Sequence, residues 1–378
     1  MSKNEDKKKF ESVSDALKFI RSNYGKESIV SNEKMNLPSY STNSMGLDYA
    51  IGNGGFVKGR IVELFGTESS GKTTIACEVG KNVQKENKAV LYVDFEHSVD
   101  LSHAKKDLGL DLNENKFVFV QPDCFEDGID IICNLVDTGL FGLVVIDSVA
   151  AMTPRSELEG EMDDKSMGLM ARLMGQAIRK LKSMLNRTST LCIFINQVRE
   201  QIGNYCGGHV TPGGKALKFF ASTRVKLHGK QIDGGMVEVD GKVVKNKVAP
   251  AMRDFEFKIN KFGIMSESEI VEKAIEYGYI KKVGSWLELG KLYRVQGIDK
   301  VSQFLNSNPK LLNKLKNKML DIMETKNESI SIKSIDKSLV KEIDDKEIDE
   351  FLNQELEPFD DLEIEEDKEI KKEKKKRD

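Results

Sequence analysis

The chain has 378 residues, of which 39% are hydrophobic and 31% are charged, and its formal net charge is −3. This length exceeds the size at which a single core stops growing, so we expect one large domain with smaller attachments. No stretch approaches the roughly 18 consecutive apolar residues of a membrane span, and residues 1–12 mix Lys with Glu and Asp, unlike a secretory signal. Five dispersed cysteines without a C-x-x-C pair argue against a zinc ribbon and favour reduced thiols. We expect a soluble, cytoplasmic protein with no membrane partner.

The first predicted element is a short amphipathic helix over about residues 9–23. Its apolar residues recur at helical spacing: Phe10, Val13, Ala16, Leu17 and Ile20. This stripe must pack either on the chain's own core or on a neighbouring subunit. A polar stretch separates the helix from the next predicted element, so we assign residues 1–34 to an N-terminal helical arm.

Residues 35–266 alternate short apolar runs with helical patterns. The hydrophobicity within each run is nearly continuous, as in strands that are buried on both faces of a parallel sheet. Helices between the runs would complete an α/β architecture with a mostly parallel central sheet. The predicted strands are Ile61–Phe65, Ala89–Val93, Phe117–Val120, Leu143–Ile146 and Leu191–Ile195.

A glycine-rich segment between the first of these strands and a helical pattern over Thr73–Gln84 carries the strongest chemical signal. Its spacing, G-x-x-x-x-G-K-T, is that of a phosphate-binding loop, where backbone N–H groups and a helix N-terminus surround an anion. Lys72 would reach the β- and γ-phosphates, and the Thr73 hydroxyl would bind Mg²⁺. An ordinary glycine-rich turn is the alternative, which the flanking strand and helix disfavour. We expect a nucleoside triphosphate site made of Gly66, Thr67, Glu68, Ser69, Ser70, Gly71, Lys72, Thr73 and Thr74.

Three further strands end in polar side chains at the edge where ligands of such sheets bind. One run ends in Asp147, which we expect to support Mg²⁺. A second ends at Glu96, a candidate general base for the attacking water, although a surface Glu that caps the next segment is an open alternative. The third leads to Gln197, an amide placed to contact the γ-phosphate or to orient water.

A loop over residues 199–214 comes directly after Gln197 and contains Gly203, Gly207, Gly208, Gly213 and Gly214. A glycine-rich loop attached to a phosphate sensor could be ordered by bound nucleotide and then bind the backbone of another polymer. A flexible surface connection is the alternative interpretation.

The composition changes again near residue 267. Residues 267–328 combine short helices and strands with many lysines and the chain's single Trp, Trp286, which indicates a small basic domain. Residues 329–378 form a charged tail, with thirteen acidic groups and one Lys in 344–367 and seven basic groups and three acidic ones in 368–378. Such blocks are most often disordered and solvated.

The order of these motifs resembles that of bacterial RecA recombinases over roughly residues 8–325. The matching stretches are GTESSGKTT at 66–74, DFEH at 94–97, IDSVAAMTP at 146–154, ELEGEMDDKSMGLMARLMGQAIRKL at 157–181, FINQVR at 194–199, GGKALKFFAS at 213–222, VVKNK at 243–247 and GSW at 284–286. The resemblance implies a RecA-like P-loop ATPase core and a small α/β C-terminal domain. It also implies a DNA-dependent ATPase that uses ATP and Mg²⁺ to form filaments on single-stranded DNA. Such a filament pairs with homologous double-stranded DNA and exchanges strands in recombinational repair.

The resemblance implies other partners as well. They are the repressor of the SOS response, whose self-cleavage the family stimulates, and loading or mediator proteins. By position, the resemblance gives Glu96 the activation of water and Gln197 the coupling of the γ-phosphate to DNA binding. Lys245 and Lys247 would reach the ATP of the adjacent protomer and stabilise the charge of phosphoryl transfer. Without the resemblance, these lysines would be interpreted as an exposed hairpin edge.

The resemblance also marks DNA-binding and interface residues. The two DNA loops correspond to residues 159–167 and 198–212, and the helix at 9–23 corresponds to an arm that docks on the next subunit. Phe219 matches a contact between protomers, and Asp100 and His103 match positions beside the adenine base. The implied DNA-binding residues are Met167, Arg172, Arg179, Arg199, Gly213 and Gly214.

Three features depart from the family pattern. His103 stands where a Tyr commonly stacks on adenine, and the second loop is one residue shorter with Gln201 in place of the usual Lys. The acidic tail is longer and ends in Lys374-Lys375-Lys376-Arg377. The acidic block could compete with DNA for the small basic domain, or it could only solubilise the chain.

Two other functions remain open from the sequence. One is a related ATPase with the same core, acting as a helicase or a repair paralogue. The other is a nucleotide-locked scaffold that presents DNA without turnover. The presence of Glu96, Lys245 and Lys247 argues against the scaffold.

Overall fold

The computed structural model describes residues 10, 12–25, 37–106, 108–160, 168–200, 209–289, 293–331 and 363–364. The chain divides into two compact units, Met1–Pro38 and Ser39–Asp378. The first contains α1 (Val13–Tyr24), whose N-cap Ser12 accepts a hydrogen bond from the Asp15 N–H. None of the described residues of α1 is buried, and Val13 is 77% exposed. The predicted helix is therefore present, and its described apolar residues are half-buried or exposed.

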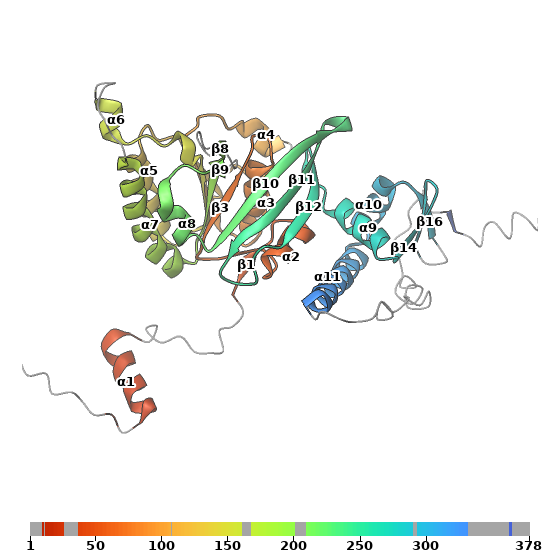
Figure 1. Cartoon of the computed structure of the whole chain (residues 1–378), viewed down its shortest axis with the longest axis horizontal. Coiled ribbons are helices and arrows are strands. Elements are labelled where there is room, and N and C mark those ends of the chain that lie inside the picture. The colour runs from red at the N-terminus through yellow and green to blue at the C-terminus, as the bar shows by residue number, and fades with distance from the viewer. Residues whose placement is uncertain are drawn as a thin grey trace, which may run out of the picture. The chain divides into compact units, whose positions relative to one another are not determined.

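A nine-stranded sheet forms the centre of the second unit (Figure 1). Six neighbouring strands run parallel, as predicted, and the remaining three extend the sheet in antiparallel order. All five strands predicted from the sequence are present, and three of them continue into the polar residues at their ends. In spatial order the strands are β13 (Gly263–Ile264), β12 (Asp254–Asn260), β11 (Met236–Asn246), β10 (Thr223–Ile232), β3 (Ile61–Gly66), β7 (Leu191–Gln197), β6 (Phe141–Asp147), β4 (Ala89–Asp94) and β5 (Phe117–Val120).

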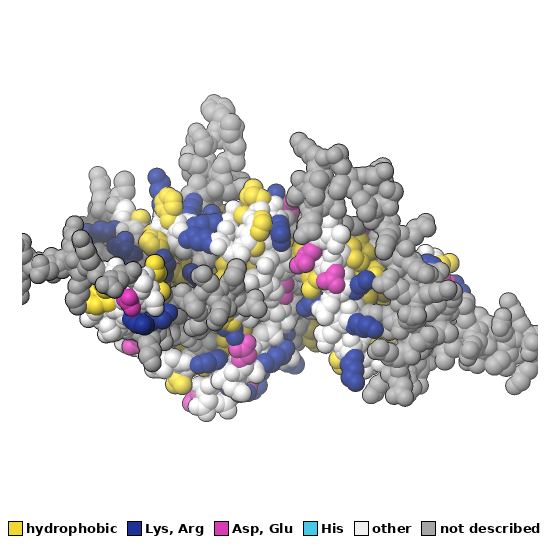
Figure 2. All heavy atoms as spheres, turned by 90° about the horizontal axis from the view of Figure 1, so that it is seen from below, with side chains coloured by type: hydrophobic (Ala, Val, Ile, Leu, Met, Phe, Trp, Pro, Cys, Tyr) yellow, Lys and Arg dark blue, Asp and Glu magenta, His cyan; other side chains and the backbone are white. Residues whose placement is uncertain are grey.

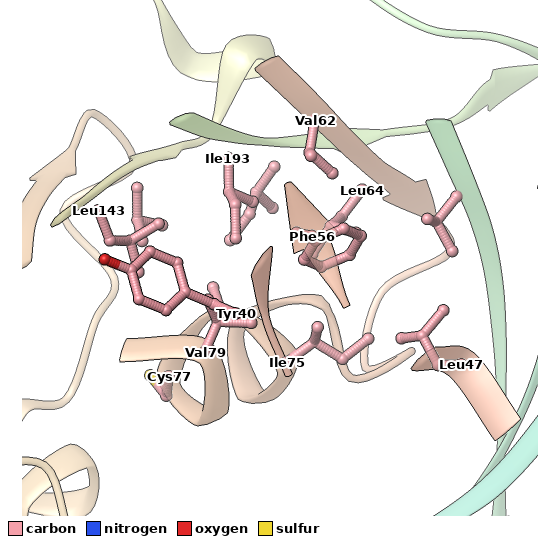
Figure 3. Close-up of a cluster of buried hydrophobic side chains, with 14 of the residues drawn as sticks. Tyr40, Leu47, Phe56, Val62, Leu64, Ile75, Cys77, Val79, Leu143 and Ile193 are labelled. Carbon is pink, nitrogen blue, oxygen red and sulfur yellow. The ribbon is translucent and has the colours of Figure 1, made fainter. Parts of the chain in front are cut away.

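Helices cover both faces of this sheet, which explains the continuous hydrophobicity of the parallel strands. On one face α3 (Lys72–Lys85) packs Ile75 and Val79 against β3, β6 and β7 (Figure 3). On the other face lie α5 (Phe125–Asp137), α7 (Leu169–Thr188) and α8 (Gly214–Phe220) (Figure 1). The core strands β3, β4 and β6 are buried along their entire length.

Short elements connect or border these layers. They are β1 (Ser39–Tyr40), α2 (Met45–Ile51), β2 (Phe56–Val57), α4 (Leu101–Lys106), the 3₁₀ turn η2 (Val149–Ala151), α6 (Arg155–Glu159), β8 (Arg199–Glu200), β9 (His209–Val210) and the 3₁₀ turn η3 (Asp233–Gly235). Strands β8 and β9 pair with each other at the two ends of the second predicted DNA loop. The backbone therefore brings those two ends together.

Residues from Ser266 onward build a core of their own. It contains Ile270, Phe304 and Met319, and Met45 of α2 also packs into it. The elements are α9 (Ser266–Glu276), β14 (Ile280–Val283), β15 (Trp286–Leu289), β16 (Tyr293–Gln296), α10 (Ile298–Ser307), α11 (Pro309–Ser331) and β17 (Glu363–Ile364), which pairs with β16. None of the helices in the described ranges is long and apolar enough to cross a membrane.

The second core is joined to the first through the N-terminus of α2. The buried Glu269 carboxylate of α9 accepts hydrogen bonds from the Gly46 N–H at 2.5 Å, the Met45 N–H at 3.1 Å and the Ser44 hydroxyl at 3.2 Å. A carboxylate at this position satisfies orphan donors of the first helical turn. Glu269 therefore caps a helix that lies more than two hundred residues earlier in the chain.

Candidate nucleotide and DNA site

The predicted phosphate loop lies between β3 and α3, at the carboxyl edge of the parallel strands. Ser69 and Gly71 have positive φ values of 54° and 81°, which turn the chain tightly into α3. A Cβ at Gly66 would overlap the Leu227 carbonyl oxygen, and one at Gly71 would meet Ile259 Cδ1 at 2.5 Å. Close packing against backbone therefore requires glycine at Gly66, and the positive φ favours glycine at Gly71.

Lys72 occupies the interior of this loop. Its Nζ donates to the Thr67 carbonyl oxygen at 2.5 Å and to the Gly66 carbonyl oxygen at 3.3 Å. Burial lowers the pKa of Lys72, whereas the charges of Asp147, Glu68 and Glu96 oppose that shift. The ammonium is thus held by neutral backbone oxygens, which anionic oxygens could replace.

Asp147 ends β6 beside the start of α3. Its Oδ2 accepts hydrogen bonds from the Tyr92 hydroxyl at 2.6 Å and the Thr73 hydroxyl at 3.3 Å. Burial raises the pKa of the Asp147 carboxyl, against the effect of the Tyr92 hydrogen bond. Within the part of the chain that the structure describes, the neighbouring buried Ser148 hydroxyl has no hydrogen-bond partner.

These oxygens suit a hard divalent cation. Mg²⁺ prefers oxygen ligands and usually keeps several waters, with one or two protein groups and substrate phosphates completing the shell. Among the described residues, no three His, Cys, Asp or Glu side chains gather as a metal cluster. Thr73 and Asp147 supply two oxygen groups of the kind that Mg²⁺ prefers, beside the predicted phosphate loop.

Glu96 and Gln197 approach each other although they lie at the ends of different strands. Gln197 Nε2 lies 3.5 Å from Glu96 Oε1, at the limit of a hydrogen bond. The Glu96 N–H donates to Asp94 Oδ1 at 3.0 Å, and this hydrogen bond holds the backbone of the turn that follows β4. The fold thus brings to one edge the residues that the sequence placed there: Lys72, Thr73, Glu96, Asp147 and Gln197.

Two residues of this edge were missed in the sequence. Asp94 is fully buried and accepts hydrogen bonds from Glu96, Val99 and Gln121. Asp94 directly follows an apolar run, as a residue at the end of a strand does, and this pattern could have identified it. The same pattern led to Glu96, two residues later. Tyr92 has the pattern of an ordinary core aromatic, and only the folded sheet shows its hydroxyl on Asp147.

The residues assigned to the adenine lie around α4. Asp100 Oδ1 accepts a hydrogen bond from the Ser102 N–H at 2.8 Å, just before the helix. His103 lies within α4, and its side chain is outside the described residues. The structure thus places Asp100 and leaves the stacking role of His103 a prediction.

Lys245 and Lys247 lie at the other end of the sheet from the phosphate loop. Lys245 pairs with Arg224 of β10, which in turn pairs with Glu63 near the start of β3, whereas the loop begins at the end of β3. Their ammonium groups donate to the Phe219 carbonyl oxygen, at 2.8 Å from Lys245 and 3.2 Å from Lys247. Strand β11 pairs with both β10 and β12 only as far as Lys242, whereas Lys245 pairs with β10 alone and Lys247 follows the strand, so the alternative of an exposed hairpin edge stays open.

Burial lowers the pKa of both lysines, and neighbouring cations lower it further: Lys247 and Arg224 for Lys245, and Lys182 and Arg60 for Lys247. The Phe219 side chain beside them is 70% exposed. A cationic cluster with an exposed aromatic ring is suited to meeting an anionic surface on another molecule.

The predicted DNA residues are only partly described. Arg172 and Arg179 are exposed on α7, and their spacing of seven residues puts them on one face of the helix. Gly213 and Gly214 have φ values of 86° and 74°, and a Cβ at either would collide with Val149 or Ala171. Met167, Gln201 and the side chain of Arg199 lie outside the described residues. Among the described side chains on the face shown in Figure 2, Lys and Arg outweigh Asp and Glu.

Comparisons with known proteins agree with this geometry. The RecA N-terminal domain family matches residues 11–265, and the RecA C-terminal domain family matches residues 268–324. The chain belongs to the RecA family. As a member of this family it is a recombinase and a DNA-dependent ATPase that binds nucleotide. The α/β fold and the family expected from the motifs are both confirmed.

Three relatives illustrate how far the similarity extends. Protein RecA of Chlorobium chlorochromatii is 41% identical over 86% of this chain and 95% of its own length. Protein RecA of Caulobacter vibrioides is 45% identical over 78% of this chain and 85% of its own. Protein RecA of Mesoplasma florum is 42% identical over 84% of this chain and 97% of its own.

Proposed function

We propose that this RecA-family chain binds ATP with Mg²⁺ at the carboxyl edge of its sheet. The loop from Gly66 to Thr74 would surround the phosphates, with Lys72 turning from the loop carbonyls to the phosphate oxygens. Thr73 and Asp147 would hold Mg²⁺, which supplies charge neutralisation of the phosphates. The convergence of Lys72, Thr73 and Asp147 carries this proposal.

Glu96 and Gln197 provide the remaining chemistry at this edge. Glu96 would take a proton from the attacking water, and Gln197 would sense the γ-phosphate. Their separation of 3.5 Å supports a shared task, because a contact to phosphate by the amide changes the environment of the carboxylate. The base beside Asp100 and His103 would be adenine.

We further propose that the chain assembles as a filament in which each ATP lies between protomers. Lys245 and Lys247 lie toward the start of β3, whereas their own phosphate loop follows its end, which suits a role at the site of a neighbour. Phe219 and α1 would contact adjacent protomers, since both expose apolar side chains. We assign residues 1–34 to the oligomerisation arm, 35–266 to the core, 267–328 to the small domain and 329–378 to the tail.

DNA would bind through α7 and the two loops at residues 159–167 and 198–212. Arg172 and Arg179 would contact phosphates, as would Arg199 and the backbone at Gly213 and Gly214, while Met167 would lie near the bases. Such contacts are independent of sequence and sensitive to salt. Both single-stranded and double-stranded DNA are partners in strand exchange, and we propose that the SOS repressor and mediator proteins bind the filament. Free thiols at Cys77, Cys124, Cys133 and Cys192 suit the reducing cytoplasm.

Turnover of ATP with and without single-stranded DNA tests this proposal. We expect DNA to accelerate turnover, and Lys72→Ala to lower it by roughly 100-fold or more, because it removes a principal charge contact to the phosphates. Turnover that is indifferent to DNA would defeat the proposal. A strand-exchange assay with homologous duplex separates a recombinase from a helicase. DNA binding that needs only a non-hydrolysable nucleotide, with no ATP turnover, would favour the scaffold.

A further inference from the structure

A buried polar network joins three strands of the central sheet below the nucleotide edge. Glu63 of β3 is fully buried, and its two carboxylate oxygens have different partners. Arg224 Nε of β10 donates to one oxygen at 2.5 Å, and Asn196 Nδ2 of β7 donates to the other at 3.0 Å. Strands β10 and β7 flank β3 on its two sides, so Glu63 ties both neighbours to the strand that leads into the phosphate loop.

Asn196 extends this network to both ends of the second DNA loop. Its Nδ2 also donates to the Pro212 carbonyl oxygen at 3.1 Å, and its Oδ1 accepts from the Gln197 N–H at 3.0 Å. Gln197 immediately precedes the loop, and Pro212 closes it. The buried Asn196 side chain, which is hydrogen-bonded to Glu63, therefore holds the two ends of the loop.

Arg224 extends the network to the cationic cluster at the other end of the sheet. It pairs with Lys245 across β10 and β11, at a point where the register shifts. Lys245 Nζ donates to the carbonyl oxygens of Lys218 at 2.6 Å and Phe219 at 2.8 Å, at the end of α8. Helix α8 begins directly after Pro212 and Gly213. The loop and the cluster are therefore connected by the covalent chain through α8 and, across the sheet, by the pairing of β10 with β11.

The chemistry of the network makes it stiff. A buried carboxylate is stable only with partners, and removing one partner of such a pair leaves an uncompensated charge. Hydrogen bonds in a low dielectric are also strong, so a full set restricts each member to one geometry. The Asn196 side chain is hydrogen-bonded to Glu63, to the Pro212 carbonyl oxygen and to the Gln197 N–H. If it keeps all three bonds, it cannot move with Gln197 unless Pro212 also moves.

We propose that Asn196 and Glu63 are positioning residues that transmit the nucleotide state at Gln197 to the second DNA loop and, through Arg224, to Lys245. This inference rests on the proposed ATP and DNA functions. Nucleotide that draws Gln197 toward the phosphate shifts the amide of Asn196, and the shift is passed to Pro212 because Glu63 prevents the side chain from rotating freely. Neither residue touches nucleotide or DNA.

The test is the ratio of two dissociation constants for single-stranded DNA, one with ADP and one with a slowly hydrolysed ATP analogue. A purely structural defect weakens both states together, whereas loss of coupling moves the ratio toward one. In the full-length chain, we expect Asn196→Ala to reduce the ratio by roughly tenfold, with nucleotide affinity changed by less than about threefold. Asn196→Ala leaves the Glu63–Arg224 pair in place, so the fold should persist.

Thr190→Ala is the matched control. Thr190 is equally buried immediately before β7, and its hydroxyl donates to the Phe141 carbonyl oxygen at 2.7 Å, outside the network. We expect this variant to lose comparable stability and to keep the wild-type ratio. Glu63→Gln, which removes the charge and keeps the shape, should lower the ratio as Asn196→Ala does.

Three results would overturn the inference. A wild-type ratio in both Asn196→Ala and Glu63→Gln would show that the network only stabilises the sheet. An equal fall of the ratio in Thr190→Ala would show that any loss of stability has this effect. If the DNA affinity of the wild-type protein did not depend on the nucleotide, the proposed function itself would be wrong. The first two results differ from this one because in them the ratio measured for the wild-type protein is still greater than one.

Discussion

The nucleotide edge and the junction between α2 and α9 each contain a buried carboxylate, and the two are used differently. Glu269 at the junction accepts two backbone N–H groups and one hydroxyl, which closes the N-terminus of a helix. Among the described residues, the Asp147 carboxylate at the nucleotide edge accepts hydrogen bonds from two hydroxyls, and the hydroxyl of Ser148 beside it has no partner. A structural carboxylate has its bonds filled by the protein, whereas a carboxylate reserved for a ligand retains unused capacity.

The largest expected effect is that of Asp147→Asn. The change removes the anion but not the shape, so we expect ATP turnover to fall by roughly 100-fold or more. Stability should hold or rise slightly, since burial disfavours the charged form. Steady-state turnover against Mg²⁺ concentration and thermal unfolding measure the two quantities. A large loss of stability together with the loss of turnover would show that Asp147 also has a structural role, like that of Glu269.

Glu269→Ala should show the opposite profile. It leaves the Met45 and Gly46 N–H groups and the Ser44 hydroxyl without their acceptor, so we expect unfolding free energy to fall by about 2–4 kcal/mol. Nucleotide affinity should be unchanged, because the hydrogen bonds that Glu269 accepts come from the N-terminus of α2 and not from the phosphate loop. Denaturant unfolding and nucleotide titration measure these effects. A loss of nucleotide affinity in a folded variant would contradict the separation of roles.

The pH dependence of stability sharpens the same point. Burial raises the pKa of Glu269 to about 7, against the effect of its hydrogen bonds, so the folded state binds a proton that the unfolded state has released. Stability should therefore be highest below about pH 4.5 for this group and fall as pH rises through 7, by at most on the order of 3 kcal/mol. Burial likewise raises the pKa of Asp48 to about 6, which acts in the same direction.

Glu269→Gln isolates the contribution of this one group. Unfolding free energy measured between pH 5 and pH 8 should fall less steeply in the variant than in the wild type, with the slope due to Asp48 retained. Identical slopes would mean that Glu269 is ionised throughout this range.

The smallest expected effect comes from Tyr92→Phe. This variant keeps the packed ring and removes only the hydroxyl that donates to Asp147 at 2.6 Å. We expect the Mg²⁺ concentration for half-maximal turnover to rise roughly tenfold, because a group that orients a ligand is lost. Stability should change by about 1 kcal/mol. An unchanged Mg²⁺ requirement would assign Tyr92 to the core alone.

Much of the nucleotide edge could be predicted from the sequence because its signals are local. The loop from Gly66 to Thr74 is continuous, and Asp147 and Gln197 each come after an apolar run whose length and composition mark a strand. The carboxyl ends of parallel strands meet at one edge, so these residues had to come close once the α/β class was known. The strand limits were correct to within two residues for the same reason.

The sequence by itself determined the fold class, the family and the polar ends of the strands. The tertiary structure decided which distant groups meet: the Tyr92 hydroxyl on Asp147, the Glu269 carboxylate on α2, and Glu63 between Asn196 and Arg224. It also decided that Lys245 and Lys247 lie away from the phosphate loop of their own chain. Periodicity and spacing report only neighbours along the chain, whereas these bonds depend on sheet order and register, which arise when whole elements pack.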